Sequence, residues 1–202
     1  MTDPAKSTGD LGAHALEDLR YIRATMARAG AFSAVPGRGL VLAGATALAA
    51  AWLARAARAA GGERAWLVAW LIELVIAGGI AFVSVRAKAR ATGEDTTGAP
   101  ARRFFASFAL PCALAVPLSL ALLRAGAFEL LPGVWLGLYG LALLAGWGAV
   151  TREVVPRLGL SFALLAVGAL LSPAAWGDAY MAAGFGGLHI GFGIWIARRF
   201  GG

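Results

Sequence analysis

The sequence predicts an all-α, polytopic membrane protein with six transmembrane helices, and three observations support this fold class. Of its 202 residues, 59% are hydrophobic and only 14% are charged, whereas about a quarter of the residues of an ordinary soluble domain are charged. The apolar residues form long blocks, and most basic residues fall between these blocks. This distribution excludes a soluble domain and a disordered chain. It also argues against nucleic-acid binding despite a net charge of +7, because that function needs basic residues clustered on one solvated face.

Six blocks are candidates to cross a bilayer core of about 30 Å, which needs about 20 apolar residues. Five of them have 19 to 22 residues each, namely residues 65–85, 104–123, 130–151, 158–177 and 179–197. The first block, residues 39–54, has only 16 residues, but Arg38 and Arg55 can extend their side chains to the interfaces and let the helix run longer. Three prolines are expected to kink the third and fifth spans: Pro111, Pro117 and Pro173.

Lys and Arg are divided unequally between the connections. Fourteen of them precede the first span or lie in the second-to-third connection, the fourth-to-fifth connection and the tail, whereas four lie in the other three connections. The positive-inside rule therefore predicts that both termini are cytoplasmic, as an even number of spans requires. The Ala-, Gly- and Arg-rich composition favours a bacterial inner membrane, and no cleavable signal peptide is evident. Trp52, Trp66 and Trp176 fall at predicted outer span ends, where an aromatic belt is expected.

The chain is predicted to divide into a cytosolic segment, residues 1–30, and a transmembrane domain, residues 31–202. Within the first segment, residues 10–29 predict an amphipathic helix with Asp10 as N-cap and Gly30 as its end. Its apolar face consists of Leu16, Leu19, Ile22 and Met26. Two interpretations stay open: the helix lies on the inner membrane surface, or it binds a groove of a protein partner. Farther along, the polar residues 91–100 predict a mobile cytoplasmic loop.

The first and fourth spans begin alike. Residues 31–53 and 127–149 match at nine of 23 aligned positions, including a Phe and a Pro-Gly pair in register. The offset of 96 residues would divide the transmembrane domain into halves of three spans, residues 31–126 and 127–202. Halves with an odd number of spans face opposite ways, as in the inverted repeats of many transporters. The alternative is that Pro-Gly simply begins two unrelated helices, because Pro is favoured in the first turn.

Five predicted spans carry a polar or polarisable side chain close to their centres: Thr46, Glu73, Cys112, Tyr139 and His189. Such a layer can be a binding site, a proton relay or a set of hydrogen bonds that fixes helix packing. An ionisable residue at this depth is costly and predicts a function. His189 favours the structural interpretation, because a neutral imidazole can hydrogen-bond within a helix bundle.

Glu73 is the strongest single indication of a site. Trp66 and Trp70 precede it by seven and three residues, so all three side chains share one helix face. A carboxylate beside aromatic rings suits an organic cation or a proton. The alternative is a protonated Glu73 that hydrogen-bonds a neighbouring helix as a structural contact. A direct contact between Glu73 and His189 is not predicted by any spacing.

Two hypotheses for function follow. The first is a small transporter or channel-like protein, in which Glu73 handles charge and Thr46, Tyr139, His189 and the two tryptophans line a polar pocket. The second is a membrane-anchored regulatory or scaffold protein, in which the polar layer is structural and the N-terminal helix binds a partner. An enzyme is less favoured, because no nucleophile–base pair stands out and no catalytic residue is predicted. No metal or cofactor site is predicted either, since no Gly-rich phosphate-binding motif occurs and the bundle contains a single His.

Two stretches carry a resemblance. The segment DLRYIRATMARAGAFSAVPG, residues 18–37, and the ending GLHIGFGIWIARRFGG, residues 187–202, resemble uncharacterised bacterial six-span integral membrane proteins. The resemblance covers both ends of the chain. It implies a bacterial membrane protein with six spans and carries no assigned activity.

Overall fold

The computed structural model describes residues 16–23, 26, 35–93, 95–147 and 154–200. The chain divides into two units, Met1–Ala31 and Phe32–Gly202, and each is described by itself. In the first unit, residues 16–23 and 26 are helical, and Leu16, Leu19, Ile22 and Met26 are all exposed. The predicted N-cap at Asp10 and the predicted helix end at Gly30 lie outside the described residues.

The described part of the second unit contains helices and no strands, so the predicted all-α class is confirmed. Its α-helices are α2 (Gly37–Thr92), α3 (Ala99–Arg124), α4 (Leu131–Ala145), α5 (Val154–Leu171), α6 (Gly177–Met181) and α7 (His189–Phe200). Three shorter elements complete them, namely the 3-10 turns η1 (Phe128–Leu130) and η3 (Ala174–Trp176) and the π-helix η4 (Ala182–Leu188). Among the described residues, five helical segments are long and apolar enough to cross a membrane: Gly37–Thr92, Ala101–Arg124, Phe128–Ala145, Val154–Leu171 and Ala174–Phe200.

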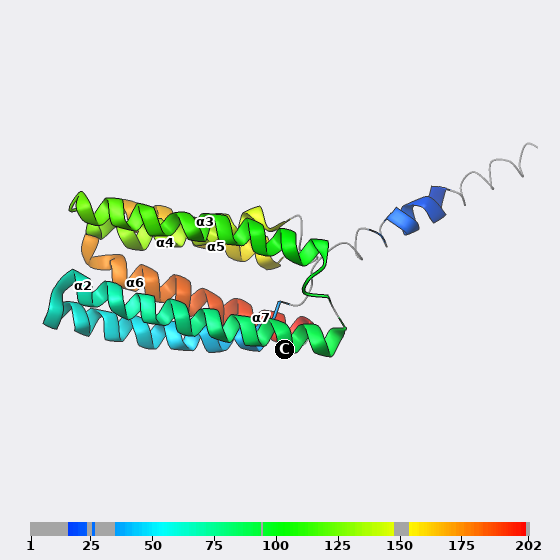
Figure 1. Ribbon diagram of the computed structural model, residues 1–202, viewed down its shortest axis with the longest axis horizontal. Coiled ribbons are helices and arrows are strands. Elements are labelled where there is room, and N and C mark those ends of the chain that lie inside the picture. The colour runs from blue at the N-terminus through cyan, green and yellow to red at the C-terminus, as the bar shows by residue number, and fades with distance from the viewer. Residues whose placement is uncertain (1–15, 24–25, 27–34, 94, 148–153, 201–202) are drawn as a thin grey trace, which may run out of the picture. The chain divides into compact units, whose positions relative to one another are not determined.

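The first of these segments doubles back on itself (Figure 1). Gly62 has φ 71° and ψ −160° in the middle of the 56-residue α2, a conformation that glycine adopts at low cost. We call residues 37–61 the first arm and residues 63–92 the second arm. Lys88 Nζ donates to the Val35 carbonyl oxygen over 3.0 Å, so the start of the first arm lies beside the end of the second. The two arms correspond to the first and second predicted spans.

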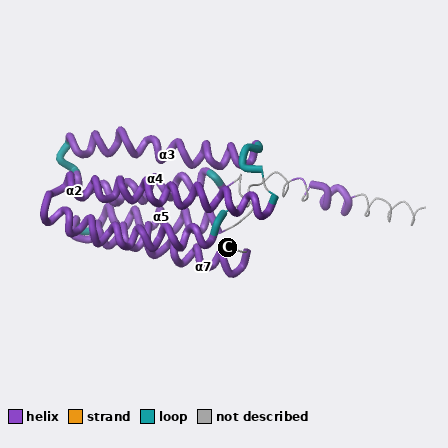
Figure 2. Tube along the Cα trace, turned by 60° about the horizontal axis from the view of Figure 1, so that its bottom comes forward, coloured by secondary structure: helices purple, strands orange, loops and turns teal. Residues whose placement is uncertain are grey.

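The helix passes pack in two groups, which Figure 1 shows one above the other; in the turned view of Figure 2 the groups overlap and α3 lies at one side. In one group the α2 hairpin packs against α7 and η4, and in the other α4 packs along α5 and α3. Glycines allow the closest approaches. A Cβ atom on Gly44 would lie 2.7 Å from the Gly186 carbonyl oxygen, and one on Gly140 would lie 2.8 Å from the Gly159 carbonyl oxygen. A Cβ atom at Gly44 or Gly140 would collide with the backbone of the neighbouring helix, so glycine fits these positions and larger residues do not.

The interior lies around α4, α5 and the last pass, residues 174–200. In the most apolar windows of these segments 44%, 33% and 33% of the residues are buried, against 11% in α2 and 6% in α3. The main core cluster includes Phe128, Leu136, Phe162 and Met181. Long apolar side chains of α2 and α3 are exposed instead, as expected for helices that face lipid.

Two expectations about connections and kinks need correction. The predicted mobile loop 91–100 is shorter, because α2 continues to Thr92 and α3 begins at Ala99. Asp95 accepts hydrogen bonds from the backbone N–H and the hydroxyl of Thr97 over 2.7 and 2.6 Å. Pro173 does not interrupt the fifth span, since α5 ends at Leu171 and Pro173 caps the following 3-10 turn. Pro111 and Pro117 do lie inside α3.

Candidate functional site

Glu73 lies on the one buried face of the second arm. From residue 63 to residue 88, the buried residues are Trp66, Trp70 and Glu73, with 1%, 4% and 6% of their surfaces exposed. Their spacing of four and three residues places them one above another on the helix. The remainder of this stretch is exposed or half-buried. Among the buried residues of this stretch, the carboxyl of Glu73 is therefore the single ionisable group.

Thr46 connects the first arm to Glu73. Its hydroxyl lies 2.8 Å from Glu73 Oε1 and 2.9 Å from the carbonyl oxygen of Ala43, one turn earlier in its own helix. Thr46 is the only hydrogen-bond partner of Glu73 within the described part of the chain. The two predicted site residues are thus brought together by the reversal of the chain at Gly62.

Trp66 is a core residue with 1% of its surface exposed, whereas Trp52 and Trp176, the other two tryptophans of the predicted outer belt, are 71% and 59% exposed. The indole N–H of Trp66 donates to Asp178 Oδ1 over 2.6 Å, and its ring contacts those of Phe128 and Trp135, with centroid distances of 5.1 and 5.7 Å. Asp178, at the start of α6, is half-buried. The bond ties the beginning of the second arm to the last pass.

Within the described ranges, Trp70 is the one buried side chain with an unused polar atom. Its indole N–H donates to no acceptor among the described residues. The ring lies 6.0 Å from that of Trp66 and 6.1 Å from that of Phe185. A buried donor without an acceptor costs free energy, about 1–3 kcal/mol, and such groups call for an explanation.

Tyr139 and His189 form a second polar pair, between α4 and the start of α7. The Tyr139 hydroxyl lies 2.7 Å from His189 Nε2, and His189 Nδ1 lies 3.0 Å from the Phe185 carbonyl oxygen. A carbonyl oxygen only accepts, so Nδ1 must carry the proton. In the neutral ring Nε2 then carries a lone pair and accepts a hydrogen bond from the Tyr139 hydroxyl. Both ring nitrogens and the phenol are satisfied in this arrangement.

The six predicted site residues therefore fall into two hydrogen-bonded pairs and a tryptophan face, rather than one cluster. Glu73 and His189 have different partners, and no described hydrogen bond joins them. Phe185 lies between the two sets, because its ring contacts Trp70, Tyr139 and His189 with centroid distances of 6.1, 5.3 and 6.2 Å. Sequence analysis missed Phe185, although its place one turn before His189 was a usable signal.

Sequence analysis also missed some of the polar contacts that fix the helices. Trp135 Nε1 donates to the Ser119 hydroxyl over 2.8 Å, and the hydroxyls of Ser172 and Tyr180 lie 2.9 Å apart. Cys112, the fifth member of the predicted layer, is a free, half-buried cysteine. Within the described residues, no group of three or more His, Cys, Asp or Glu side chains has metal-binding geometry.

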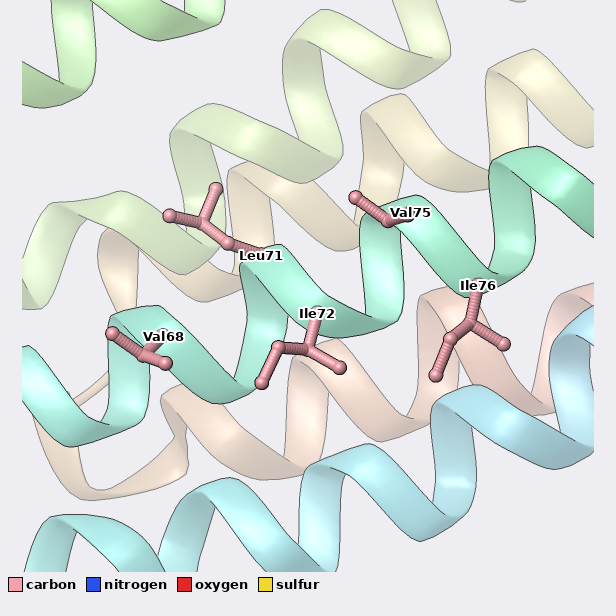
Figure 3. Close-up of a pocket in the computed structure, with 5 residues that line it drawn as sticks. All are labelled: Val68, Leu71, Ile72, Val75 and Ile76. Carbon is pink, nitrogen blue, oxygen red and sulfur yellow. The ribbon is translucent and has the colours of Figure 1, made fainter.

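An open groove of about 390 Å³ lies on the outside of the second arm and not at the polar pairs. Figure 3 shows its lining, which consists of the apolar side chains Val68, Leu71, Ile72, Val75 and Ile76. These residues recur at helical spacing on a face distinct from that of Glu73. Such an uncharged face suits lipid tails.

Comparison of the chain with models of protein families, with curated proteins and with solved structures finds no match. The functional argument therefore depends on the residues of the site itself.

Proposed function

We propose that this protein binds a small molecule or ion at Glu73 and moves it across a bacterial inner membrane. One observation carries the proposal: a carboxyl group is buried between two apolar helix arms, and its only polar partner among the described residues is the Thr46 hydroxyl. Placing an ionisable side chain at the centre of a membrane costs about 3 kcal/mol. A purely structural contact between the arms could be made by a neutral residue at lower cost.

The surroundings of Glu73 support a ligand of small size and positive charge. Trp66 and Trp70 share its face, and aromatic faces attract cations. The unused indole N–H of Trp70 adds a donor for an oxygen atom of a ligand or its water. Tyr139 and His189 contact this face through Phe185 and would stabilise it from the interior as a structural pair.

The packing of the helices supports an inverted repeat of three plus three passes. One group contains the two arms of α2 (passes one and two) and residues 174–200 (pass six). The other contains α4, α5 and α3 (passes four, five and three). Exchanging each pass of one half for its counterpart in the other half converts the first group into the second. Transporters with inverted repeats use the two-fold relation to alternate access. Glu73 and Thr46 both belong to the first half, and Trp70 on the same face contacts Phe185 of the second half. With six passes, both termini would be cytoplasmic, as the positive charges predict.

The proposal is tested by thermal unfolding of the detergent-purified protein, with Glu73→Gln as the matched variant. The probes are Na⁺, K⁺, tetramethylammonium and steps of pH. A ligand that binds only the folded protein stabilises it by RT ln(1 + [L]/Kd), about 2.7 kcal/mol at a hundredfold excess over Kd. We expect at least one probe to stabilise the wild type and to leave the variant unchanged. Equal responses of both proteins to every probe would contradict a ligand site at Glu73.

A second candidate function, a membrane-anchored scaffold, is favoured by a separate observation. In the helix over residues 16–23, Leu16, Leu19 and Ile22 expose about half of their surfaces or more, as does Met26. An apolar helix face of this kind can lie on lipid or fill a partner's groove. Deletion of residues 1–30 separates the two functions: loss of the cellular phenotype with unchanged thermal stability supports the scaffold, and a retained phenotype supports the site at Glu73.

A further inference from the structure

The hydroxyl of Thr46 lies between two oxygen acceptors. Oγ1 is 2.9 Å from the Ala43 carbonyl oxygen and 2.8 Å from Glu73 Oε1, and both distances are those of hydrogen bonds. A hydroxyl carries one proton and can therefore donate one full hydrogen bond. If Glu73 were ionised, the three oxygens would hold one proton for two contacts.

A protonated Glu73 supplies the second proton. The carboxyl O–H then donates to Thr46 Oγ1, and the Thr46 hydroxyl donates to the Ala43 carbonyl oxygen, so that both short contacts contain a hydrogen atom. With an ionised Glu73, the single Thr46 hydroxyl hydrogen would instead be shared between the carboxylate and the Ala43 carbonyl oxygen, or would bond to the carboxylate alone. The first arrangement leaves no net charge among apolar helices, which is the state that hydrocarbon surroundings favour.

In the part of the chain that the structure describes, no neighbouring charge compensates for an ionised Glu73. On the elements that pack against α2, the titratable groups have other partners: His189 bonds to Tyr139, Asp178 to Trp66 and Tyr180 to Ser172. The basic side chains of α7, Arg198 and Arg199, belong to its last turn. The charged residues of α2 itself lie toward the ends of the two arms: Arg38, Arg55, Arg58, Glu63, Arg64, Arg86, Lys88 and Arg90.

We propose that the Glu73 carboxyl is protonated, that its O–H donates a hydrogen bond to Thr46 Oγ1, and that this proton exchanges with water. The proton is then the cation that the site binds. The inference depends on the proposed function and names its ligand. On release, the carboxyl O–H bond breaks, the proton passes to a water molecule as hydronium, and the Thr46 hydroxyl turns from the Ala43 carbonyl to the carboxylate. Uptake reverses these steps. Trp70, one turn before Glu73 on the same buried face, provides an N–H for the oxygen of that water.

Infrared spectroscopy of the full-length protein in lipid tests the proton directly. At pH 7 we expect a carbonyl-stretching band of a protonated carboxylic acid, equivalent to one carboxyl per chain, that disappears in Glu73→Gln. The band should shift in D₂O because the proton exchanges. Thr46→Val removes the hydroxyl at constant shape and should move the band to higher frequency, and the matched control Thr46→Ser should return it.

Two results would overturn the proposal: no Glu73-dependent acid band at pH 7, or a band that Thr46→Val leaves in place while the variant unfolds at the temperature of the wild type. The outcome also separates this inference from the function it depends on. If Na⁺ or tetramethylammonium stabilises the wild type but not Glu73→Gln, and no acid band is seen, the binding function stands and the assignment of the ligand as a proton fails. If the acid band is seen but no response to ions or pH depends on Glu73, the protonated carboxyl stands and the binding function fails.

Discussion

The two polar pairs in the bundle differ in how completely their hydrogen bonds are made. Tyr139 and His189 lie in the interior, and the phenol, both imidazole nitrogens and the Phe185 carbonyl form a closed set of bonds. Thr46 and Glu73 lie between the arms of a peripheral hairpin, where the Thr46 hydroxyl is within hydrogen-bond distance of two oxygens and the nearby Trp70 N–H has no acceptor among the described residues. Both pairs give the same signal in the sequence, a polar residue at the centre of an apolar span. The closed set of bonds at Tyr139 and His189 is what a structural contact requires, whereas the unused Trp70 N–H beside Glu73 needs an explanation, and the proposed site supplies one.

The largest expected effect comes from separating the hairpin from the last pass. A Cβ atom on Gly44 would lie 2.7 Å from the backbone oxygen of Gly186, which cannot move without shifting a helix. We expect Gly44→Ala to lower the free energy of unfolding by about 1–3 kcal/mol. Thermal unfolding measures the loss. Gly78, in the second arm, has open space around it, so Gly78→Ala is the control and should be neutral or stabilising by up to about 1 kcal/mol.

The second effect sharpens the structural side of the comparison. Tyr139→Phe removes the donor to His189 Nε2 and leaves a buried acceptor unpaired. We expect a loss of about 1–2 kcal/mol of stability, the range of hydrogen bonds between membrane helices, with ligand responses at Glu73 unchanged. The measurement is thermal unfolding with and without the best stabilising ion. A variant that keeps full stability and loses the ion response would reverse the roles of the two pairs.

A smaller loss of stability is expected from Thr46→Val. The Thr46–Glu73 bond lies in the less buried hairpin, and its removal should cost about 0.6 kcal/mol, the average measured for such bonds in a membrane protein. The effect on function should be larger than the effect on stability, because Thr46 is the only partner of Glu73 in the described chain. The quantity to measure is the loss of ion response divided by the loss of stability, determined for Thr46→Val and for Tyr139→Phe in the same thermal-unfolding assays. Equal ratios would remove the distinction between the pairs.

The helices themselves could be predicted from the sequence, because apolar blocks of about 20 residues admit few other structures. The shared face of Trp66, Trp70 and Glu73 also follows from helical spacing. The partners could not be predicted in the same way. Thr46 meets Glu73 because the chain reverses at Gly62, and α2 stays helical up to that residue, through most of the connection that lies between the predicted spans 39–54 and 65–85.

Two further features depend on tertiary contacts that the sequence pattern does not encode. Trp66 has the position of an interfacial residue, yet its N–H finds Asp178, 112 residues later in the chain, and this bond favours burial. The π-helix Ala182–Leu188 precedes His189 in a Gly-rich stretch. Glycine lowers helix propensity without specifying which helix type replaces the regular one.

The smallest expected effect lies outside the membrane, at the connection between α2 and α3. The hydroxyl and backbone N–H of Thr97 donate to Asp95 and hold the pKa of that carboxyl below its usual value. Because the pKa in the folded state is the lower one, the carboxylate stabilises the loop above the pKa of the unfolded state. This contribution is lost as the pH falls through the folded-state value. Thr97→Ala should raise the Asp95 pKa toward its usual value in an NMR titration, and an unchanged titration would show that the hydroxyl does not control it.

The central claim is that Glu73, and not the Tyr139–His189 pair, handles the transported charge. Proteoliposomes loaded with a pH-sensitive dye test it most directly, with a K⁺ diffusion potential driving protons through wild type, Glu73→Gln and Tyr139→Phe at equal protein content. The account predicts a flux in the wild type that Glu73→Gln reduces to the level of empty liposomes, because the amide cannot release a proton, and that Tyr139→Phe largely retains. A flux that survives Glu73→Gln but is lost in Tyr139→Phe would contradict it.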